Sequence, residues 1–173
     1  LQDWIGSIDI NSLYPSVIRA LNMAPETIVG QLRQTLTEST IEQMMTVEKK
    51  SFAGAWEGEF GSLEYQAVMR KDRAQSITID WETGESNILS AAEVYELIFN
   101  NDQPWMLSAN GTIFTHEFAG VIPGLLERWY SERKELQAKR KKAIDAGNKT
   151  ETAFWDKRQL VKKINLNSLY GAI

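Results

Sequence analysis

Residues 121–170 read VIPGLLERWYSERKELQAKRKKAIDAGNKTETAFWDKRQLVKKINLNSLY. Pro123 suits the first turn of a helix, and apolar residues then recur with a period of about 3.6 residues as far as Leu136. The pattern breaks at Gly147-Asn148, a pair of residues typical of a turn. We therefore expect a long helix that ends at about Ala146.

A second helix is expected from about Glu151 to Tyr170, antiparallel to the first. Four of its apolar residues are available for packing: Phe154, Leu160, Val161 and Ile164. Charge is concentrated here, because residues 127–163 carry 12 Lys+Arg against 6 Asp+Glu, whereas residues 1–126 carry 7 against 17. A cationic helix pair suits a polyanion such as a phosphate chain or nucleic acid. A solvated, salt-bridged helix face explains the same pattern, and charge alone does not separate the two.

The amino-terminal stretch predicts a strand, a tight turn and a helix. Alternating residues from Trp4 to Ile10 indicate a buried strand, with Asp9 at its carboxyl end. Ser12 then stands where a helix N-cap belongs, and an apolar stripe of helical period continues to about Asn22. A carboxylate in the position of Asp9 can hold a divalent ion beside a phosphate site, because hard Mg²⁺ prefers oxygen ligands. An aspartate that only caps a turn explains the same placement.

The middle of the chain gives weaker signals and no chemical motif. Three elements are expected there: a helix over Ile41–Lys50, a strand over Ser76–Trp81 that ends in a turn at residues 82–85, and a helix over Ala91–Asn100. Ser90 and Glu93 would close the last helix with a capping box. A β-hairpin should follow, in which Trp105–Ser108 and Thr112–Thr115 flank the turn Asn110-Gly111. The fold class is therefore expected to be mixed α/β (α+β).

Composition excludes several kinds of site. No apolar run approaches the ~20 residues needed to span a bilayer, and the start lacks a signal-peptide pattern. The chain has no cysteine and one histidine, His116, which excludes a disulfide framework, a thiolate metal site and a His-rich metal site. The lack of cysteine is compatible with a reducing intracellular compartment, and we expect no membrane partner. Because the chain opens on Leu1 and stops at Ile173 where a helix would be finishing, we also expect it to be an excerpt.

The far end of the chain places cationic and amide groups on one helix face. Lys163, Asn167 and Tyr170 stand at positions i, i+4 and i+7. Arg133, on the preceding helix, is placed to converge on the same side. Arginine and lysine that face a common groove would clamp a triphosphate, the arginine through its planar fork and the lysine as a point charge. The plainer alternative is a solvated basic face.

Two stretches also resemble sequence motifs of a known family. Residues 9–16, DINSLYPS, resemble motif A of the family B DNA polymerases, D-x-x-S-L-Y-P-S. Residues 163–171, KINLNSLYG, resemble their motif B, K-x-x-x-N-S-L-Y-G, and the two motifs stand in the order of the family. Within the family, residues 22–30 and 109–135 look most like the T-even-type, cyanophage-like bacteriophage replicative polymerases.

The resemblance implies a role for each matched residue. Asp9 and Lys163 would be the catalytic residues, and Asp9 with the backbone carbonyl of Ile10 would bind one metal ion of a two-Mg²⁺ site. Tyr14 would act as the steric gate against a 2′-hydroxyl. The residues that would hold the incoming nucleotide are Ser12, Leu13, Tyr14, Arg133, Lys163 and Asn167. Those at the nascent base pair would be Tyr170 and Gly171.

The resemblance also divides the chain and implies its partners. Residues 1–30 would belong to the palm and residues 121–173 to the fingers, with an intervening region over residues 31–104 and a β-hairpin over residues 105–120. The partners would be a DNA primer–template, deoxynucleoside triphosphates, the rest of the polymerase chain and a sliding clamp. The reaction would be template-directed nucleotidyl transfer during DNA replication, in the cytoplasm of a host cell.

The sequence departs from the family pattern in two places. Four residues after Arg133, T-even relatives have a lysine and this chain has the neutral Gln137, while Lys134, Lys139 and Lys141 stand at other helical phases. Motif C, Y-x-D-T-D, which would supply the second metal-binding aspartate, does not occur in the chain, so we expect no polymerisation by the chain alone. A protein-primed family B polymerase and a catalytically inactive nucleic-acid-binding homologue are the alternative interpretations.

Overall fold

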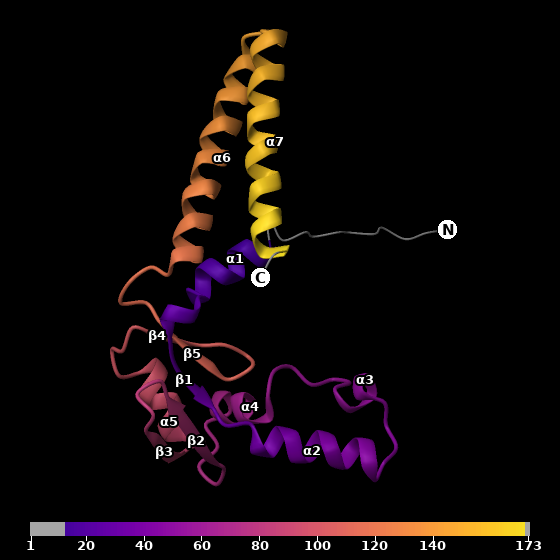
Figure 1. Cartoon of the computed structure of the whole chain (residues 1–173), viewed down its shortest axis with the longest axis vertical. Helices are drawn as coiled ribbons and strands as arrows, with labels where there is room; N and C mark the ends of the chain where they lie inside the picture. The colour runs from indigo at the N-terminus through magenta and orange to yellow at the C-terminus, as the bar shows by residue number, and fades with distance from the viewer. Residues whose placement is uncertain (1–12, 172–173) are drawn as a thin grey trace. The chain divides into compact units, whose positions relative to one another are not determined.

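The computed structural model describes residues 13–171, which fall into two compact units (Figure 1). We call residues 13–20 with 120–171 the helical unit, and residues 21–119 the sheet unit. The strand expected over Trp4–Ile10 and the N-cap expected at Ser12 lie outside the described residues. Among the helices of the described part, none has the length and apolarity that crossing a membrane demands.

The helical unit consists of helix α1 (Leu13–Leu21) up to residue 20, with α6 (Val121–Asp145) and α7 (Lys149–Gly171). The antiparallel pair α6–α7 confirms the helical hairpin predicted from the sequence. Gly147, at φ +66°, turns the chain between the two helices. Asn148 then accepts the backbone N–H of Glu151 through its side-chain Oδ1 at 3.1 Å. The predicted turn therefore ends one helix and caps the next.

A partly polar seam joins α6 to α7. On α6, buried and half-buried residues recur at steps of three and four, the spacing of a coiled-coil interface: Leu126, Trp129, Arg133, Leu136, Arg140 and Ala143. On α7 the corresponding residues are Trp155, Gln159, Lys162, Leu166 and Leu169. Arg140 Nε lies 2.8 Å from Asp156 Oδ1, an ion pair without hydrogen-bond geometry, and Lys162 pairs with Glu132. Charged side chains thus take part in holding the hairpin together.

The apolar residues of α7 that were expected to pack are exposed instead. Their exposed fractions are 47% for Phe154, 46% for Leu160, 55% for Val161 and 53% for Ile164. The seam runs from Trp155 through Lys162 to Leu166, so these four side chains lie outside the line of contact with α6. The expected packing is therefore wrong within the helical unit.

The sheet unit is built on a five-stranded antiparallel sheet of order β3-β2-β1-β5-β4. Its strands are β1 (Ile28–Leu32), β2 (Ser76–Trp81), β3 (Ser86–Ser90), β4 (Trp105–Leu107) and β5 (Thr112–Thr115). Its helices are the 3₁₀ helix η1 (Pro25–Thr27), α2 (Thr35–Thr46), α3 (Phe52–Ala55), α4 (Leu63–Met69) and α5 (Ala91–Phe99). The sheet, α4 and α5 bury one common core that includes Leu32, Val68, Ile79, Val94 and Ile113. The mixed α/β fold class is confirmed.

Strand β2 and the β4–β5 hairpin match the predicted positions, and Gly111 takes φ +85° in the hairpin turn. Strands β1 and β3 are not predicted by the local pattern. The central strand β1 contains Gly30, where a Cβ atom would lie 2.9 Å from Cε3 of Trp81. Glycine is thus required by the close approach of β2, although it weakens the strand signal in the sequence.

Helix α2 covers Thr35–Thr46, whereas the sequence predicts a helix over Ile41–Lys50. The residue before α2 provides no side-chain cap. Instead, the buried carboxylate of Glu64, on α4, accepts the backbone N–H groups of Leu36 at 2.8 Å and Thr37 at 3.2 Å, together with the Thr37 hydroxyl. The predicted start is wrong because the capping group is 27 residues away from Thr37 in the sequence.

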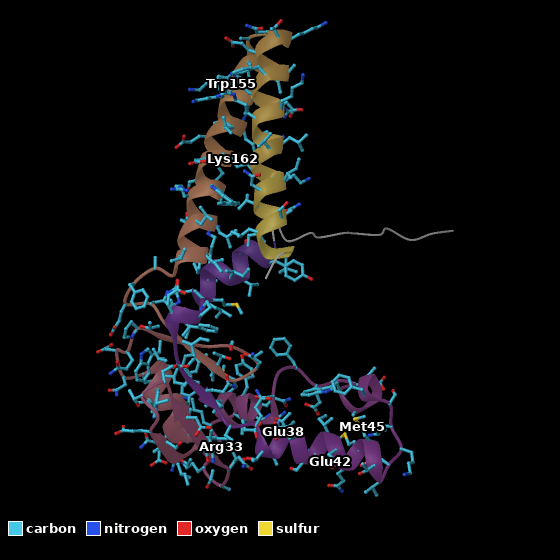
Figure 2. All side chains as sticks on the ribbon, viewed as in Figure 1. Arg33, Glu38, Glu42, Met45, Trp155 and Lys162 are labelled. Carbon is cyan, nitrogen blue, oxygen red and sulfur yellow. The ribbon has the colours of Figure 1, made fainter. Side chains whose placement is uncertain are left out.

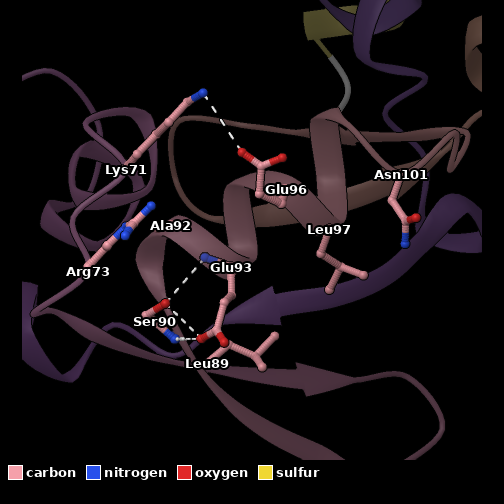
Figure 3. Close-up of a pocket in the computed structure, with 9 residues that line it drawn as sticks. All are labelled: Lys71, Arg73, Leu89, Ser90, Ala92, Glu93, Glu96, Leu97 and Asn101. Carbon is pink, nitrogen blue, oxygen red and sulfur yellow. Dashed lines mark hydrogen bonds and ion pairs between the residues drawn. The ribbon is translucent and has the colours of Figure 1, made fainter.

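The capping box predicted at the start of α5 is present (Figure 3). Ser90 Oγ accepts the backbone N–H of Glu93 at 3.3 Å. The Glu93 carboxylate accepts the Ser90 hydroxyl at 2.7 Å and the Ser90 backbone N–H at 2.8 Å. The hydroxyl first, and the backbone N–H second, hold the pKa of Glu93 below its ordinary value.

Replacing Glu93 with glutamine is expected to remove a pH-dependent part of the stability. Because the folded pKa of Glu93 is depressed, its contribution is present above the unfolded pKa and is lost as the pH falls through the folded pKa. The parent chain and Glu93→Gln should therefore differ most in free energy of unfolding at neutral pH, and should converge as the pH falls through the folded pKa of Glu93. Urea titrations at neutral pH and at an acid pH measure this difference. A difference that stays the same at both would contradict the role of the carboxylate.

Candidate functional site

The predicted site residues fall partly within the described structure. Six are described there: Leu13 and Tyr14 on α1, Arg133 on α6, and Lys163, Asn167 and Gly171 on α7. Of Tyr170 only the backbone is described, as part of α7. Three lie outside the described residues: Asp9, Ile10 and Ser12.

Helix α1 lies at the end of the hairpin where α6 begins and α7 ends (Figure 1). Arg19 fastens it there, because its guanidinium pairs with Glu127 and lies 4.6 Å from the centre of the Tyr130 ring. The first residues of α1 remain accessible, since Leu13 is 44% and Tyr14 62% exposed. The start of α1 and the carboxyl-terminal part of α7 are therefore at the same end of the helical unit.

One side of the hairpin gathers cationic and amide groups. Gln159, Lys163 and Asn167 follow one another at four-residue steps along α7 and so share a face. Arg133 reaches this face from α6, because its Nε donates to Gln159 Oε1 at 3.4 Å. One helical turn rises about 5.4 Å, so the Arg133 contact lies about one turn from Lys163 along α7. We call these four residues the basic flank.

The cations of the basic flank are not neutralised within residues 13–171. No carboxylate of that part of the chain forms a salt bridge with Arg133 or Lys163, and the side chains of Lys163 and Asn167 are exposed. Lys162, next in sequence and labelled in Figure 2, differs, because it pairs with Glu132 of α6. Two cations without carboxylate partners, beside amide groups, suit an anion with several oxygens, such as a chain of phosphates.

Gln159 is the member of the basic flank that the sequence does not single out. Its position, four residues before Lys163, obeys the same spacing rule that links Lys163 to Asn167. That rule was therefore sufficient to find it. The contact with Arg133 was not predictable, because it depends on how α6 and α7 are aligned.

The departure at Gln137 also has a place in the structure. Gln137 follows Arg133 by one turn of α6 and is exposed. Two of the nearby lysines are engaged elsewhere, since Lys134 and Lys139 stand over aromatic rings at 4.7 Å and 5.0 Å from the ring centres. Helix α6 is thus neutral at the position where the T-even pattern has a lysine.

Two hollows lie away from the basic flank. A groove of about 810 Å³ beside α5 is lined by side chains of both charges, among them Lys71, Arg73, Glu93 and Glu96 (Figure 3). A hollow of about 410 Å³ lies on the other flank of the hairpin, beside Lys162. Neither is lined by a predicted site residue. Charge and geometry, and not enclosure, therefore distinguish the basic flank.

Metal ligation is not found in the described residues. Within them, no group of three or more His, Asp or Glu side chains could hold a metal ion. His116 is exposed. The carboxylate that the sequence singles out, Asp9, lies outside this part of the chain. Its role as a metal ligand therefore rests on the sequence.

Comparison with known proteins finds a family model and two viral DNA polymerases that resemble this chain. The family model described as DNA polymerase family B matches residues 2–173. A DNA polymerase of Paramecium bursaria Chlorella virus NY2A is 26% identical over 167 residues, which are 96% of this chain and 12% of that protein. A DNA polymerase of red sea bream iridovirus is 26% identical over 168 residues, 96% of this chain and 17% of that protein. The chain thus spans less than a fifth of the length of these relatives. No solved structure matches it.

Proposed function

The chain belongs to DNA polymerase family B, and we propose that it is the part of a DNA-directed DNA polymerase that grips the incoming nucleotide. In the complete polymerase it binds a deoxynucleoside triphosphate opposite a template base, for transfer to the primer 3′ end. Its partners are the DNA primer–template, the nucleotide and the rest of the polymerase chain, with a sliding clamp as a further partner. The printed names of the two viral relatives support this class of enzyme.

The contact between Arg133 and Gln159 carries the proposal, because it brings Arg133 to the face of Lys163 and Asn167. Phosphoryl transfer asks little covalent chemistry of the protein and depends on positioning and on charge stabilisation. Arg133 grips non-bridging oxygens of the triphosphate through its fork, and Asn167 donates from its amide. Lys163 is the catalytic cation of the flank, because it faces the oxygens on which negative charge develops.

Motif A supplies the other half of the proposed site. The backbone N–H groups of Ser12 and Leu13 hold the triphosphate tail, since the first N–H groups of a helix are available to an anion and α1 begins at Leu13. Tyr14 is 62% exposed, and its ring is the steric gate beneath the deoxyribose. At the far end of α7, Tyr170 and Gly171 lie beside the nascent base pair.

Asp9 and Ile10 form the metal-binding part of the site. A carboxylate and a backbone carbonyl are hard oxygen donors, and such a set suits Mg²⁺ better than a softer transition metal. When bound, Mg²⁺ supplies positive charge next to the phosphate oxygens. The chain holds only one part of the ligand set, because no motif C aspartate occurs in it.

We assign residues 1–30 to the palm and residues 121–173 to the fingers, with residues 31–104 and 105–120 between them. Strand β1 crosses residue 30 and pairs with β5, so the intervening residues and the hairpin fold together in the sheet unit. Along the chain, the sheet unit therefore stands between motif A and motif B.

Within the family, we propose that the chain derives from a T-even-type, cyanophage-like bacteriophage polymerase. The amino-acid sequence of residues 22–30 and 109–135 supports this branch. The two relatives described above come from a Chlorella virus and an iridovirus. The sequence on either side of the segment in its gene decides between them. Greater similarity to Chlorella virus polymerases than to phage polymerases along that length would reject the phage branch.

Primer extension tests the proposed function with the complete polymerase that carries this segment. We expect Mg²⁺-dependent, template-directed incorporation by the complete polymerase, and none by the purified 173-residue chain, because it lacks the second metal-binding aspartate. Incorporation by the 173-residue chain, free of contaminating polymerase, would refute this. A complete polymerase that binds DNA but incorporates nothing would favour an inactive homologue, and one that needs a protein primer would favour the protein-primed group.

A further inference from the structure

The sheet unit carries an arm formed by α2 and α3, to one side of the core that the sheet makes with α4 and α5 (Figure 1). A groove of about 390 Å³ lies on this arm. Its lining includes four large apolar residues and two acidic ones: Ile41, Met45, Phe52, Trp56, Glu38 and Glu42. Figure 2 shows Glu38, Glu42 and Met45 along α2. None of these residues belongs to the proposed nucleotide site.

The apolar lining of the groove is accessible and ordered by its own contacts. Phe52 is 64% exposed and Met45 40% exposed. Phe52 meets Trp56 edge to face, with ring centroids 6.4 Å apart and an interplanar angle of 62°. Apolar side chains that gather in a hollow beside charged residues are typical of a surface that receives a partner.

The groove also has a polar group that lacks an acceptor. The indole Nε1 of Trp56 is buried, and within the described residues no atom accepts its hydrogen bond. A buried N–H without an acceptor is costly, and native proteins rarely keep one without a role. Because Trp56 lines the groove, an oxygen atom on a bound segment can provide the acceptor after a small shift of the indole.

Two carboxylates select the charge of that segment. Glu38 and Glu42 stand one turn apart on α2 and are exposed, and in the described part of the chain no lysine or arginine pairs with either. The sheet unit as a whole has 6 Lys+Arg against 15 Asp+Glu. This field repels a phosphate backbone and attracts a cationic segment.

We propose that the α2–α3 groove docks a basic amphipathic helix of a partner protein. The helix lays one or two large apolar side chains against Met45 and Phe52, in the helix-in-groove mode. Lysine or arginine side chains one turn apart on the helix pair with Glu38 and Glu42. An oxygen of the same segment accepts the N–H of Trp56. Docking at this surface is independent of nucleotide binding.

Fluorescence anisotropy with a labelled helical Leu/Lys peptide of about 15 residues tests the docking on the 173-residue chain. We expect saturable binding of this probe and none of a matched Leu/Glu peptide. The double variant Glu38→Gln/Glu42→Gln should bind the Leu/Lys probe about tenfold more weakly. The control Glu82→Gln/Glu85→Gln removes the same charge at the β2–β3 turn and should stay within about twofold of the parent. An equal loss in both double variants would show unspecific charge attraction and overturn the proposal.

A second variant separates docking from folding. Trp56→Phe removes the donor that has no acceptor, so the midpoint of thermal unfolding should not fall, while affinity for the probe should drop about fivefold. Unchanged affinity would remove Trp56 from the docking contact and overturn that part of the proposal.

Two further outcomes identify a different occupant and would overturn the proposal. If the complete polymerase no longer binds the probe, its own remainder covers the groove. If the chain self-associates and Glu38→Gln/Glu42→Gln abolishes the association in sedimentation experiments, a second copy occupies it. Loss of nucleotide binding alone would leave docking unaffected, so the two proposals fail separately.

Discussion

Replacing Lys163 with alanine in the complete polymerase is expected to lower kcat/KM for nucleotide incorporation by about a hundred- to a thousandfold. Lys163 is exposed on the basic flank, about one turn from the contact between Arg133 and Gln159. In the described structure no carboxylate neutralises it. Its removal leaves the charge that develops on the transferred phosphoryl group without this cation. Single-turnover incorporation of one nucleotide measures the change.

Lys157→Ala is the matched control for this experiment. Lys157 is also an exposed lysine on α7, and six residues of helix turn it about 120° away from Lys163. Its replacement should change kcat/KM by no more than about twofold. Lys163→Arg should lose less than Lys163→Ala, because it keeps the charge but changes its geometry. Equal effects of Lys157→Ala and Lys163→Ala would show that the basic flank does not act on the nucleotide.

Replacing Glu64 with alanine is expected to destabilise the sheet unit by about 3 kcal/mol or more. The residue is 2% exposed, and its carboxylate accepts the N–H groups of Leu36 and Thr37 and the hydroxyl of Thr37. Alanine leaves these donors without their acceptor and removes the cap from the start of α2. Urea unfolding of the 173-residue chain, followed by far-UV circular dichroism, measures the loss.

Glu57→Ala provides the control, because Glu57 is an exposed glutamate in the same part of the chain. It should leave the free energy of unfolding nearly unchanged. Should Glu64→Ala prove equally mild, water or another donor arrangement must satisfy the start of α2, and Glu64 would not be its cap. If Glu64→Ala loses more of the helical than of the sheet signal in circular dichroism, the arm unfolds first.

The sequence predicts those helices and strands whose boundaries are set by turn or capping residues close to them in the chain. Asn110-Gly111 sets the β4–β5 turn, Ser90 with Glu93 starts α5, and Gly147 separates α6 from α7. The start of α2 and the central strand β1 depend on distant partners. Glu64 caps the helix from α4, and β1 becomes a strand by pairing on both sides with β2 and β5. A local sequence pattern cannot predict such contacts, because they join residues that are far apart in the chain.

The candidate site shows the same division. Spacing along one helix is enough to place Lys163 and Asn167 on a common face. Spacing cannot tell which of two adjacent lysines is neutralised. Glu132, on α6, forms a salt bridge with Lys162, whereas Lys163 is exposed. The contact of Arg133 with Gln159 likewise depends on the alignment of α6 with α7. Roles for residues 9–12 come from the family motif alone.

Nuclear magnetic resonance titration of the ¹⁵N-labelled 173-residue chain with dATP and Mg²⁺ tests the nucleotide-binding role of the basic flank most directly. Nucleotide up to about 10 mM exceeds the usual range of KM and allows for weak binding by a segment. The largest amide shifts should occur at Arg133, Gln159, Lys163 and Asn167, and Lys163→Ala should abolish them. No shifts at these positions, or larger shifts around Lys162 and Glu132, would contradict the account.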